Sequence, residues 1–321
     1  MHTMKSSINT KQLSERIRRG DRKALAQGIS LLESGDSQAF ELLRHISSRT
    51  HRAMRIGITG LPGSGKSTLI DRMANQWLNE GRKVGVIMVD PTSPITGGAL
   101  LGDRIRLKSI QSHPNIFIRS MATRGRLGGL ALASHYAADL MDAAGYERIL
   151  IETVGVGQLE VDVASAVHCV VVLLIPGAGD EIQIMKAGLM EIADFFIMNK
   201  MDLDKDRIYF SLLERTLRLS YQTSSANQEK KANLFPVSTL SREGVDRFLK
   251  ALEEKIKLTP VKRTKTLLHE VMLLLEQKIL SQALHPSRIE REMKKILKKN
   301  KSLSAFRIAE KLSQKLRIQL R

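Results

Sequence analysis

Residues 60–68 form a glycine-rich run with the composition of a phosphate-binding loop. The run reads Gly60-Leu-Pro-Gly-Ser-Gly-Lys66-Ser67-Thr68 and fits the pattern Gly-x-x-x-x-Gly-Lys-Ser/Thr in full. Glycines let the backbone curl until its N–H groups point at phosphate oxygens, and a helix beginning directly afterwards adds the positive end of its dipole. Lys66 is expected to reach the β- and γ-phosphates, and the Ser67 hydroxyl to take one position on Mg²⁺. The expected phosphate-binding residues are Gly60, Pro62, Gly63, Ser64, Gly65, Lys66, Ser67 and Thr68.

A second motif, Asn199-Lys200-Met-Asp202, follows an apolar run and predicts which base the site prefers. The Asp202 carboxylate can accept hydrogen bonds from both N1–H and the 2-amino group of guanine, a donor pair that adenine lacks. The motif therefore predicts binding of GTP and GDP in preference to ATP. Backbone N–H groups after the next apolar run are expected to meet the guanine O6, namely those of Ser238, Thr239 and Leu240.

Acidic residues follow other apolar runs and are candidates for metal binding and nucleotide sensing. Asp90 ends one run, where its carboxylate would lie in the ligand crevice and bind Mg²⁺ directly or through water; the alternative is a turn cap. Asp103, in the glycine-rich stretch 97–104, is a candidate metal ligand or water-holding residue, and a solvated loop charge is the alternative. Glu152 begins Glu-Thr-Val-Gly155, an acid followed by a glycine whose N–H is placed to sense the γ-phosphate.

The segment Pro176-Gly-Ala-Gly-Asp180-Glu181 ends another apolar run and predicts a further mobile loop. Lys186 follows, where it can pair with these acids. The alternative is an ordinary strand-to-helix turn with Asp180 as the N-cap. Gln158 is a residue type that can orient water, but its offset from Gly155 leaves it without an assigned role.

These motifs require a fold that brings the ends of the apolar runs together. Seven continuous apolar runs alternate with helical patterns, which predicts a mostly parallel sheet covered on both faces. The carboxyl ends of parallel strands share one edge, where ligands bind. The sequence thus predicts an α/β fold of the P-loop NTPase class. The predicted strands are 55–59, 83–90, 115–119, 148–152, 168–175, 194–199 and 234–238, and the helices between and after them are 68–80, 129–144, a helix from 204, and 243–257.

Composition and charge divide the chain into three predicted parts: an N-terminal helical extension (1–54), a P-loop domain (55–260) and a basic C-terminal helical region (261–321). The formal net charge is +18, and the C-terminal region alone carries 16 Lys and Arg against 5 Asp and Glu. Leucine and valine residues of 264–283 share one helical face there.

Other features limit the function classes. Aromatic residues make up only 4 % of the chain, which argues against base-stacking recognition of single-stranded nucleic acid. The single cysteine, Cys169, lies in an apolar run and is expected to be a buried hydrophobe, so neither a disulfide within the chain nor a cysteine metal cluster is expected. We see no signal peptide and no apolar run long enough to span a bilayer, and expect a cytoplasmic protein without membrane contact.

Taken together, the motifs resemble the MeaB/ArgK-type G proteins, GTPase chaperones of methylmalonyl-CoA mutase and related adenosylcobalamin-dependent acyl-CoA mutases. The resemblance covers roughly residues 10–260, and its most specific part is Glu-Thr-Val-Gly-Val-Gly-Gln158 followed by Pro-Gly-Ala-Gly-Asp-Glu181. The other matching runs are Val89–Ser93, Thr96–Arg106, Leu127–Gly129 and Asn199–Asp202.

The resemblance implies that Asp90, Asp103 and Glu152 surround Mg²⁺. It also implies three switch regions, at about 92–106, 153–160 and 177–188, and a homodimer formed through the C-terminal helices. GTP hydrolysis would gate cofactor loading and protect the mutase. The residues implied to pass the nucleotide state to the mutase are Asp180, Glu181, Gln183 and Lys186.

Two other functions remain open at this level. One is a GTPase switch bound to RNA or the ribosome through the basic tail, for which the charge of 261–321 is the argument. The other is a metal-delivering GTPase, which the single cysteine disfavours.

Overall fold

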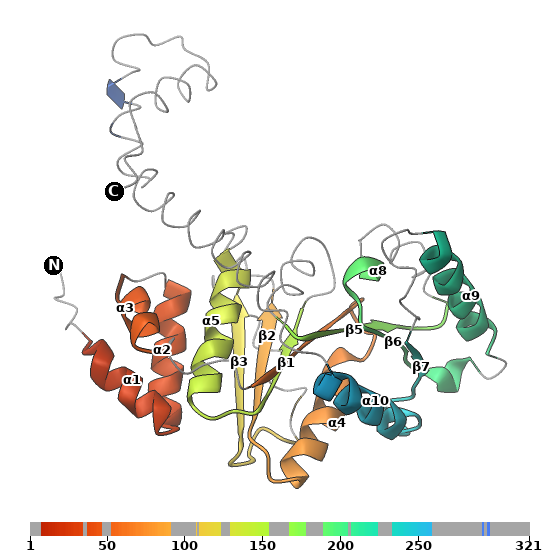
Figure 1. Ribbon diagram of the computed structural model, residues 1–321, viewed down its shortest axis with the longest axis horizontal. Coiled ribbons are helices and arrows are strands. Elements are labelled where there is room, and N and C mark those ends of the chain that lie inside the picture. The colour runs from red at the N-terminus through yellow and green to blue at the C-terminus, as the bar shows by residue number, and fades with distance from the viewer. Residues whose placement is uncertain are drawn as a thin grey trace. The chain divides into compact units, whose positions relative to one another are not determined.

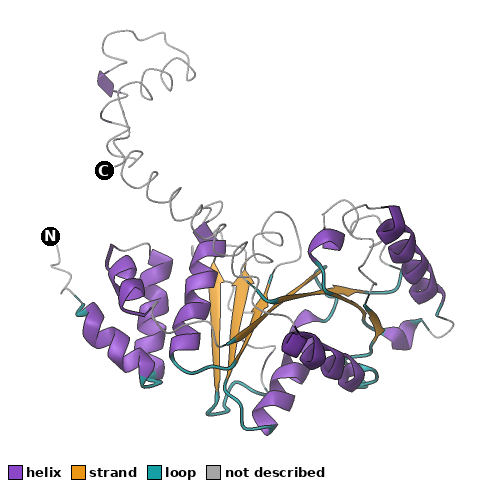
Figure 2. Cartoon of the chain, in the orientation of Figure 1, coloured by secondary structure: helices purple, strands orange, loops and turns teal. Residues whose placement is uncertain are grey.

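Figures 1 and 2 show the computed structural model of the chain. The chain divides into two compact units, residues 1–262 and 263–321, and the elements named below all belong to the first. The structure describes residues 8–34, 37–46, 53–90, 107, 109–122, 129–153, 167–177, 189–204, 207–223, 233–258, 291, 294 and 295.

Seven strands form one sheet in the order β3-β2-β4-β1-β5-β6-β7, and all neighbouring pairs are parallel. The predicted α/β fold is therefore confirmed. Strand β3 is longer than predicted, because Ser120 to Ala122 continue the pairing with Met88 to Asp90 of β2. The strands are β1 (Met54–Gly60), β2 (Val84–Asp90), β3 (Ile116–Ala122), β4 (Arg148–Glu152), β5 (Cys169–Leu174), β6 (Phe195–Met198) and β7 (Leu234–Pro236).

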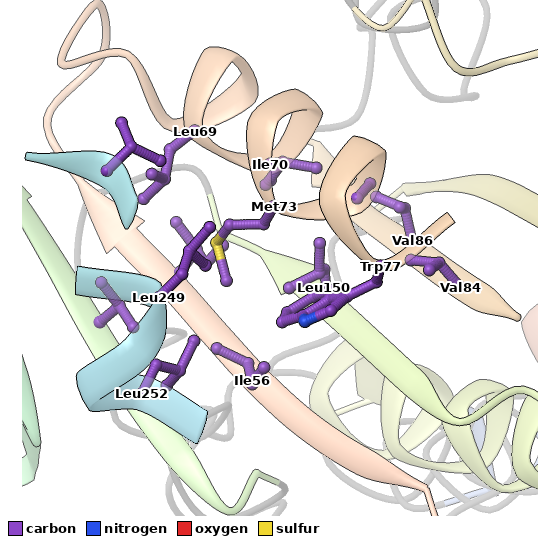
Figure 3. Packing of buried hydrophobic residues seen from close by; sticks show 14 of the residues in the cluster. Ile56, Leu69, Ile70, Met73, Trp77, Val84, Val86, Leu150, Leu249 and Leu252 are labelled. Carbon is purple, nitrogen blue, oxygen red and sulfur yellow. The ribbon is translucent and has the colours of Figure 1, made fainter. Parts of the chain in front are cut away.

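One face of the sheet is covered by α4 (Lys66–Asn79) and α10 (Val245–Leu258) (Figure 1). Alternation along β1 sends Ile56 and Ile58 to this face, as expected for a strand. Figure 3 shows the resulting core, in which Met73 of α4 lies beside Leu249 of α10 and Trp77 of α4 lies beside Leu150 of β4. Cys169 contributes to the same core and is buried, as predicted.

The other face is covered in two parts. Helix α5 (Gly129–Ala143) packs on β2, β3 and β4, and the N-terminal helices pack on α5. Helices α8 (Leu189–Ile192) and α9 (Ile208–Thr223) cover β5 and β6. The N-terminal helices are α1 (Thr10–Arg18), α2 (Arg22–Ser34) and α3 (Ser37–Ile46).

Helix starts follow local capping chemistry. The Asp21 carboxylate accepts hydrogen bonds from the backbone N–H groups of Lys23 and Ala24 at 2.9 and 3.1 Å, as expected for an N-cap of α2. The helix expected from residue 204 begins later, at Ile208. Asp204 instead accepts from the backbone N–H groups at the start of α9 and follows a short 3₁₀ helix, η2 (Met201–Leu203).

Ion pairs gather at the amino-terminal edge of the sheet. Arg148, the first residue of β4, contacts Glu253 of α10 through a pair of hydrogen bonds of 3.0 and 3.1 Å, and its guanidinium lies over the Trp77 ring. The Trp77 indole N–H donates to the same carboxylate at 3.0 Å. These contacts join α4, β4 and α10.

A second ion-pair group near that edge involves Arg55 of β1, which is 2 % exposed. Its guanidinium lies 2.6 Å from Asp139 and 3.6 Å from Asp142, both on α5. A buried charge needs such partners, because its separation from water is costly. Arg55 therefore ties the central strand to α5.

In the part of the chain that the structure describes, no helix is both long and apolar enough to cross a bilayer.

Candidate functional site

The glycine-rich loop connects the carboxyl end of β1 to the start of α4. Three of its glycines have a positive φ, which is 139° at Gly60, 78° at Gly63 and 97° at Gly65. A Cβ at Gly60 would collide with the Leu173 carbonyl, and one at Gly65 with the Asn199 amide. At Gly63 an added Cβ would meet nothing within 4 Å, so the loop has open space there. The close backbone approaches at Gly60 and Gly65 therefore require glycine.

Lys66 is the first residue of α4 and is 7 % exposed. Its ammonium donates to the backbone carbonyls of Gly60 and Leu61, at 2.7 and 3.1 Å. The positive charge is thereby held against the loop that would surround the phosphates. Backbone N–H groups at a helix start and an ammonium together make a strong anion-binding arrangement.

Ser67 and Glu152, both expected to bind Mg²⁺, lie in contact. The Ser67 hydroxyl donates to the Glu152 carboxylate, with oxygen–oxygen distances of 3.2 and 3.3 Å, and both residues are 8 % exposed. Strand register explains the pairing, because Glu152 at the end of β4 lies beside Ile58 of β1 and Met88 of β2. These oxygens are hard ligands of the kind that Mg²⁺ prefers.

Two buried hydroxyls near this edge have no hydrogen-bond partner within the described ranges. They are the Ser64 Oγ, in the loop, and the Thr153 Oγ1, directly after Glu152. Both residues are at most 2 % exposed. Buried polar groups are normally satisfied, so such groups are expected where a polar ligand binds.

Asn199 joins the loop to the predicted base-binding residues. Its side chain is fully buried, and its amide nitrogen donates to the Ser64 carbonyl at 2.7 Å and to the Thr239 hydroxyl at 3.2 Å. Its amide oxygen accepts from the Thr239 backbone N–H at 3.0 Å. Asn199 therefore links the glycine-rich loop to the loop after β7 by hydrogen bonds.

Asp202 is exposed and follows Lys200, whose φ of 58° turns the chain after β6. The Ser238 hydroxyl donates to Asp202 Oδ1 at 2.8 Å, which fixes the direction of the carboxylate. Leu240, beyond Ser238, is 81 % exposed. The predicted base-binding residues thus lie together at the carboxyl ends of β6 and β7.

Sequence reasoning missed one residue of this region. Arg72, two turns into α4, donates from Nε to the Thr239 carbonyl at 3.2 Å. No sequence pattern could have found it, because the contact joins residues that are 167 positions apart.

Several predicted site residues fall outside this geometry. The backbone of Asp90 ends β2 at the expected edge, but its side chain lies outside the described part. The remaining residues outside the described ranges are Asp103, Gly155, Gln158, Asp180, Glu181, Gln183 and Lys186.

Comparison with known proteins gives a family match over residues 25–284, to the model described as methylmalonyl-CoA mutase-associated GTPase MeaB. A protein of Pyrococcus abyssi named as a GTPase is 52 % identical over 202 residues, which are 63 % of this chain and 62 % of the relative. The chain thus spans less than two thirds of that relative. GTPase ArgK of Escherichia coli is 38 % identical over 259 residues, or 76 % of each chain.

Among solved structures, the crystal structure titled LAO/AO transport system kinase has a similar fold. The TM-score is 0.65 at 26 % sequence identity, with 97 % of this chain and 99 % of the other covered.

Proposed function

The chain belongs to the MeaB family of P-loop GTPases, and from this premise we propose that it binds and hydrolyses Mg²⁺·GTP to control an adenosylcobalamin-dependent acyl-CoA mutase. The mutase would be of the methylmalonyl-CoA mutase type. Hydrolysis would gate delivery of its cofactor, and the bound GTPase would protect it from inactivation.

The observation that carries the nucleotide part of the proposal is the linkage of two half-sites. One half contains Lys66 and Ser67 at the start of α4, and the other contains Asp202 and Thr239 after β6 and β7. Asn199 bonds to both the Ser64 carbonyl and Thr239, so the separation of the halves is fixed in the fold. A preset separation suits a ligand with a phosphate chain at one end and a base at the other.

The residues present fit Mg²⁺ in the proposed role. Two neighbouring octahedral ligands at 2.0–2.1 Å from the ion lie about 2.9 Å apart. The Ser67 and Glu152 oxygens, 3.2 and 3.3 Å apart, need only a small adjustment to share it. Asp90 and Asp103 complete the proposed set. The ion would neutralise charge that develops on the phosphate oxygens.

In the proposed reaction, the chain contributes positioning and charge. The loop N–H groups and the Lys66 ammonium would hold the β- and γ-phosphates, and hydrogen bonds to fixed donors strengthen as negative charge develops there. Gly155 would sense the γ-phosphate through its N–H.

The mutase part of the proposal is supported by the family description, which names association with methylmalonyl-CoA mutase. We propose that Asp180, Glu181, Gln183 and Lys186 pass the nucleotide state to the mutase. We further propose that residues 261–321 form a homodimer contact. The proposed division of the chain is an extension (1–54), a P-loop domain (55–260) and this C-terminal region. The proposed compartment is the cytoplasm.

The test is GTP turnover measured with and without an acyl-CoA mutase from the same organism. We expect slow basal phosphate release that the mutase stimulates, and phosphate release by Lys66→Ala that is about 10²–10³-fold slower in both conditions. Basal turnover without stimulation would contradict the proposed chaperone role but support the proposed GTPase activity. Absence of turnover in the presence of Mg²⁺ would contradict the GTPase itself.

The alternative function through the basic tail has its own test. Binding to RNA that weakens with salt and is lost after deletion of 261–321 would favour it. No binding at low salt would remove it.

A further inference from the structure

In the loop that contains Ser238, Thr239 and Leu240, both backbone polar groups of Thr239 are hydrogen-bonded to side chains from other elements. The Thr239 N–H donates to Asn199 Oδ1 at 3.0 Å, and the Thr239 carbonyl accepts from Arg72 Nε at 3.2 Å. Asn199 in turn holds the Ser64 carbonyl of the phosphate-binding loop at 2.7 Å. Arg72 is six residues after Lys66 on the helix that this loop opens. The contacts therefore form a closed ring from the phosphate-binding loop to the base-binding loop and back to α4.

Hydrogen bonding within the loop leaves one N–H group for the base. The Ser238 N–H donates to the Glu243 carbonyl at 3.0 Å, and the Thr239 N–H is taken by Asn199. For the N–H of Leu240, the described ranges hold no acceptor, and Leu240 is 81 % exposed. Of the three groups expected to meet the guanine O6, that of Leu240 is therefore the one open to a ligand.

Arg72 sets the direction of that N–H group. The carbonyl of Thr239 and the N–H of Leu240 belong to one peptide unit, which is planar and trans, so the two groups point in opposite directions. When Arg72 holds the carbonyl on the side of α4, the N–H must point away from α4. A guanidinium is well suited to this task, because its donors have fixed geometry.

We infer that Arg72 is a positioning residue for recognition of the purine 6-oxygen, acting through the Thr239–Leu240 peptide. This inference rests on the proposed guanine-nucleotide binding. The preference of the site for guanine would then come from two separate groups. Asp202 would read N1–H and the 2-amino group, whereas the Leu240 N–H, oriented by Arg72, would read the 6-oxygen. Arg72 itself would not touch the nucleotide.

The test compares three diphosphates that differ in the base groups proposed to contact Asp202 and the Leu240 N–H. GDP carries the 6-oxygen, the N1–H and the 2-amino group, IDP lacks only the 2-amino group, and 2-aminopurine riboside diphosphate lacks the 6-oxygen and with it the hydrogen on N1. Titration calorimetry of the full chain with each ligand and Mg²⁺ gives the dissociation constants. For Arg72→Met, which keeps an apolar stem, we expect binding of GDP and IDP to weaken by the same factor, about fivefold to tenfold, because one oriented hydrogen bond is lost. Binding of 2-aminopurine riboside diphosphate should be unchanged.

Three comparisons make the result specific. Asp202→Asn should show the complementary pattern, with a larger loss for GDP than for IDP. Arg72→Lys, which keeps a charged donor, should recover part of the loss. Arg148→Met, a matched substitution at the far edge of the sheet, should weaken none of the three ligands.

A merely structural role of Arg72 would weaken all three diphosphates alike, and this outcome would overturn the inference. So would unchanged binding of GDP and IDP to Arg72→Met. If the unmodified protein bound GDP no better than ADP, the proposed function would fail first, and the inference with it. The two failures are therefore distinguishable.

Discussion

At the amino-terminal edge of the sheet, buried charges contact side chains of opposite charge, whereas the hydrogen bonds described above at the carboxyl edge join charges to backbone carbonyls and to a hydroxyl. Arg55 lies against Asp139 and Asp142, and Arg148 against Glu253. At the other edge, the Lys66 ammonium donates to two carbonyls and Glu152 accepts from a serine hydroxyl.

The contrast separates two uses of a buried charge. An ion pair made within the chain is complete when the protein folds, so its loss should lower stability. Hydrogen bonds from a charge to neutral groups can be exchanged for contacts with a charged ligand at a smaller cost. We therefore expect substitutions at the amino-terminal edge to change the free energy of unfolding and those at the carboxyl edge to change nucleotide chemistry.

The largest expected effect is that of Arg55→Met. Two buried carboxylates on α5 would lose their common partner, and the free energy of unfolding should fall by about 3–5 kcal/mol, measured by urea denaturation. Adding Asp139→Asn should recover part of the loss. A change below about 1 kcal/mol would break the comparison, since it would mean that the ion pair does not support the fold.

Lys66→Ala is the corresponding test at the carboxyl edge. Loss of a preorganised cation at the phosphates should lower kcat for GTP hydrolysis by about 10²–10³-fold, or roughly 3–4 kcal/mol of barrier. The urea midpoint should move little. Lys250→Ala, on the exposed side of α10, is the control and should leave turnover unchanged. A large loss of stability in Lys66→Ala would mean that the Lys66 charge also stabilises the fold, and would contradict the contrast between the two edges.

Arg148→Met should have an intermediate effect. Its ion pair is partly buried, with 12 % of the Arg148 side chain and 23 % of that of Glu253 exposed. We expect a loss of about 2 kcal/mol in unfolding free energy, between the values for surface and buried pairs. GDP affinity measured well below the unfolding temperature should not change. A change in that affinity would contradict the expectation that the amino-terminal edge affects stability alone.

Asp21 gives the smallest effect and tests the pH dependence of stability. The backbone N–H of Ala24 and the Arg16 guanidinium lower the pKa of its carboxyl group below the usual value. Stability from this ionised cap is present above the unfolded-state pKa and is lost as pH falls through the lower folded-state pKa. Asp21→Asn keeps a capping side chain but not the charge. In thermal melts, the melting temperature of Asp21→Asn should therefore be slightly lower than that of the unmodified protein at pH 7, and the difference should disappear in acid. A difference that persists in acid would contradict the charge effect.

Local pattern was enough to predict the strands and the phosphate-binding loop. Continuous apolar runs such as 169–174 are typical of strands in a sheet covered on both faces, and the glycine spacing from Gly60 to Gly65, followed at once by Lys66, is highly specific to a phosphate-binding loop. Strand ends at Asp90 and Glu152 then placed acids at one edge without any knowledge of strand order.

Contacts between distant side chains could not be predicted in this way. The partners Arg148 and Glu253 are 105 positions apart, and Arg72 and Thr239 are 167 apart. Such pairs depend on how helices lie over the sheet, which neither periodicity nor motif spacing encodes. The role of Asn199 illustrates the limit. Its motif predicted a place at the nucleotide, whereas its bonds to Ser64 and Thr239 became visible only in the folded chain.

Trp77 is the only tryptophan of the chain, and its position gives the protein a built-in optical signal. The indole is buried between α4 and α10, bonded to Glu253, and lies roughly 16 Å along the helix from Lys66. Its fluorescence should therefore stay constant while a nucleotide is titrated and shift to longer wavelength when the core opens to water. A single unlabelled sample can thus report its own unfolding while a ligand is present.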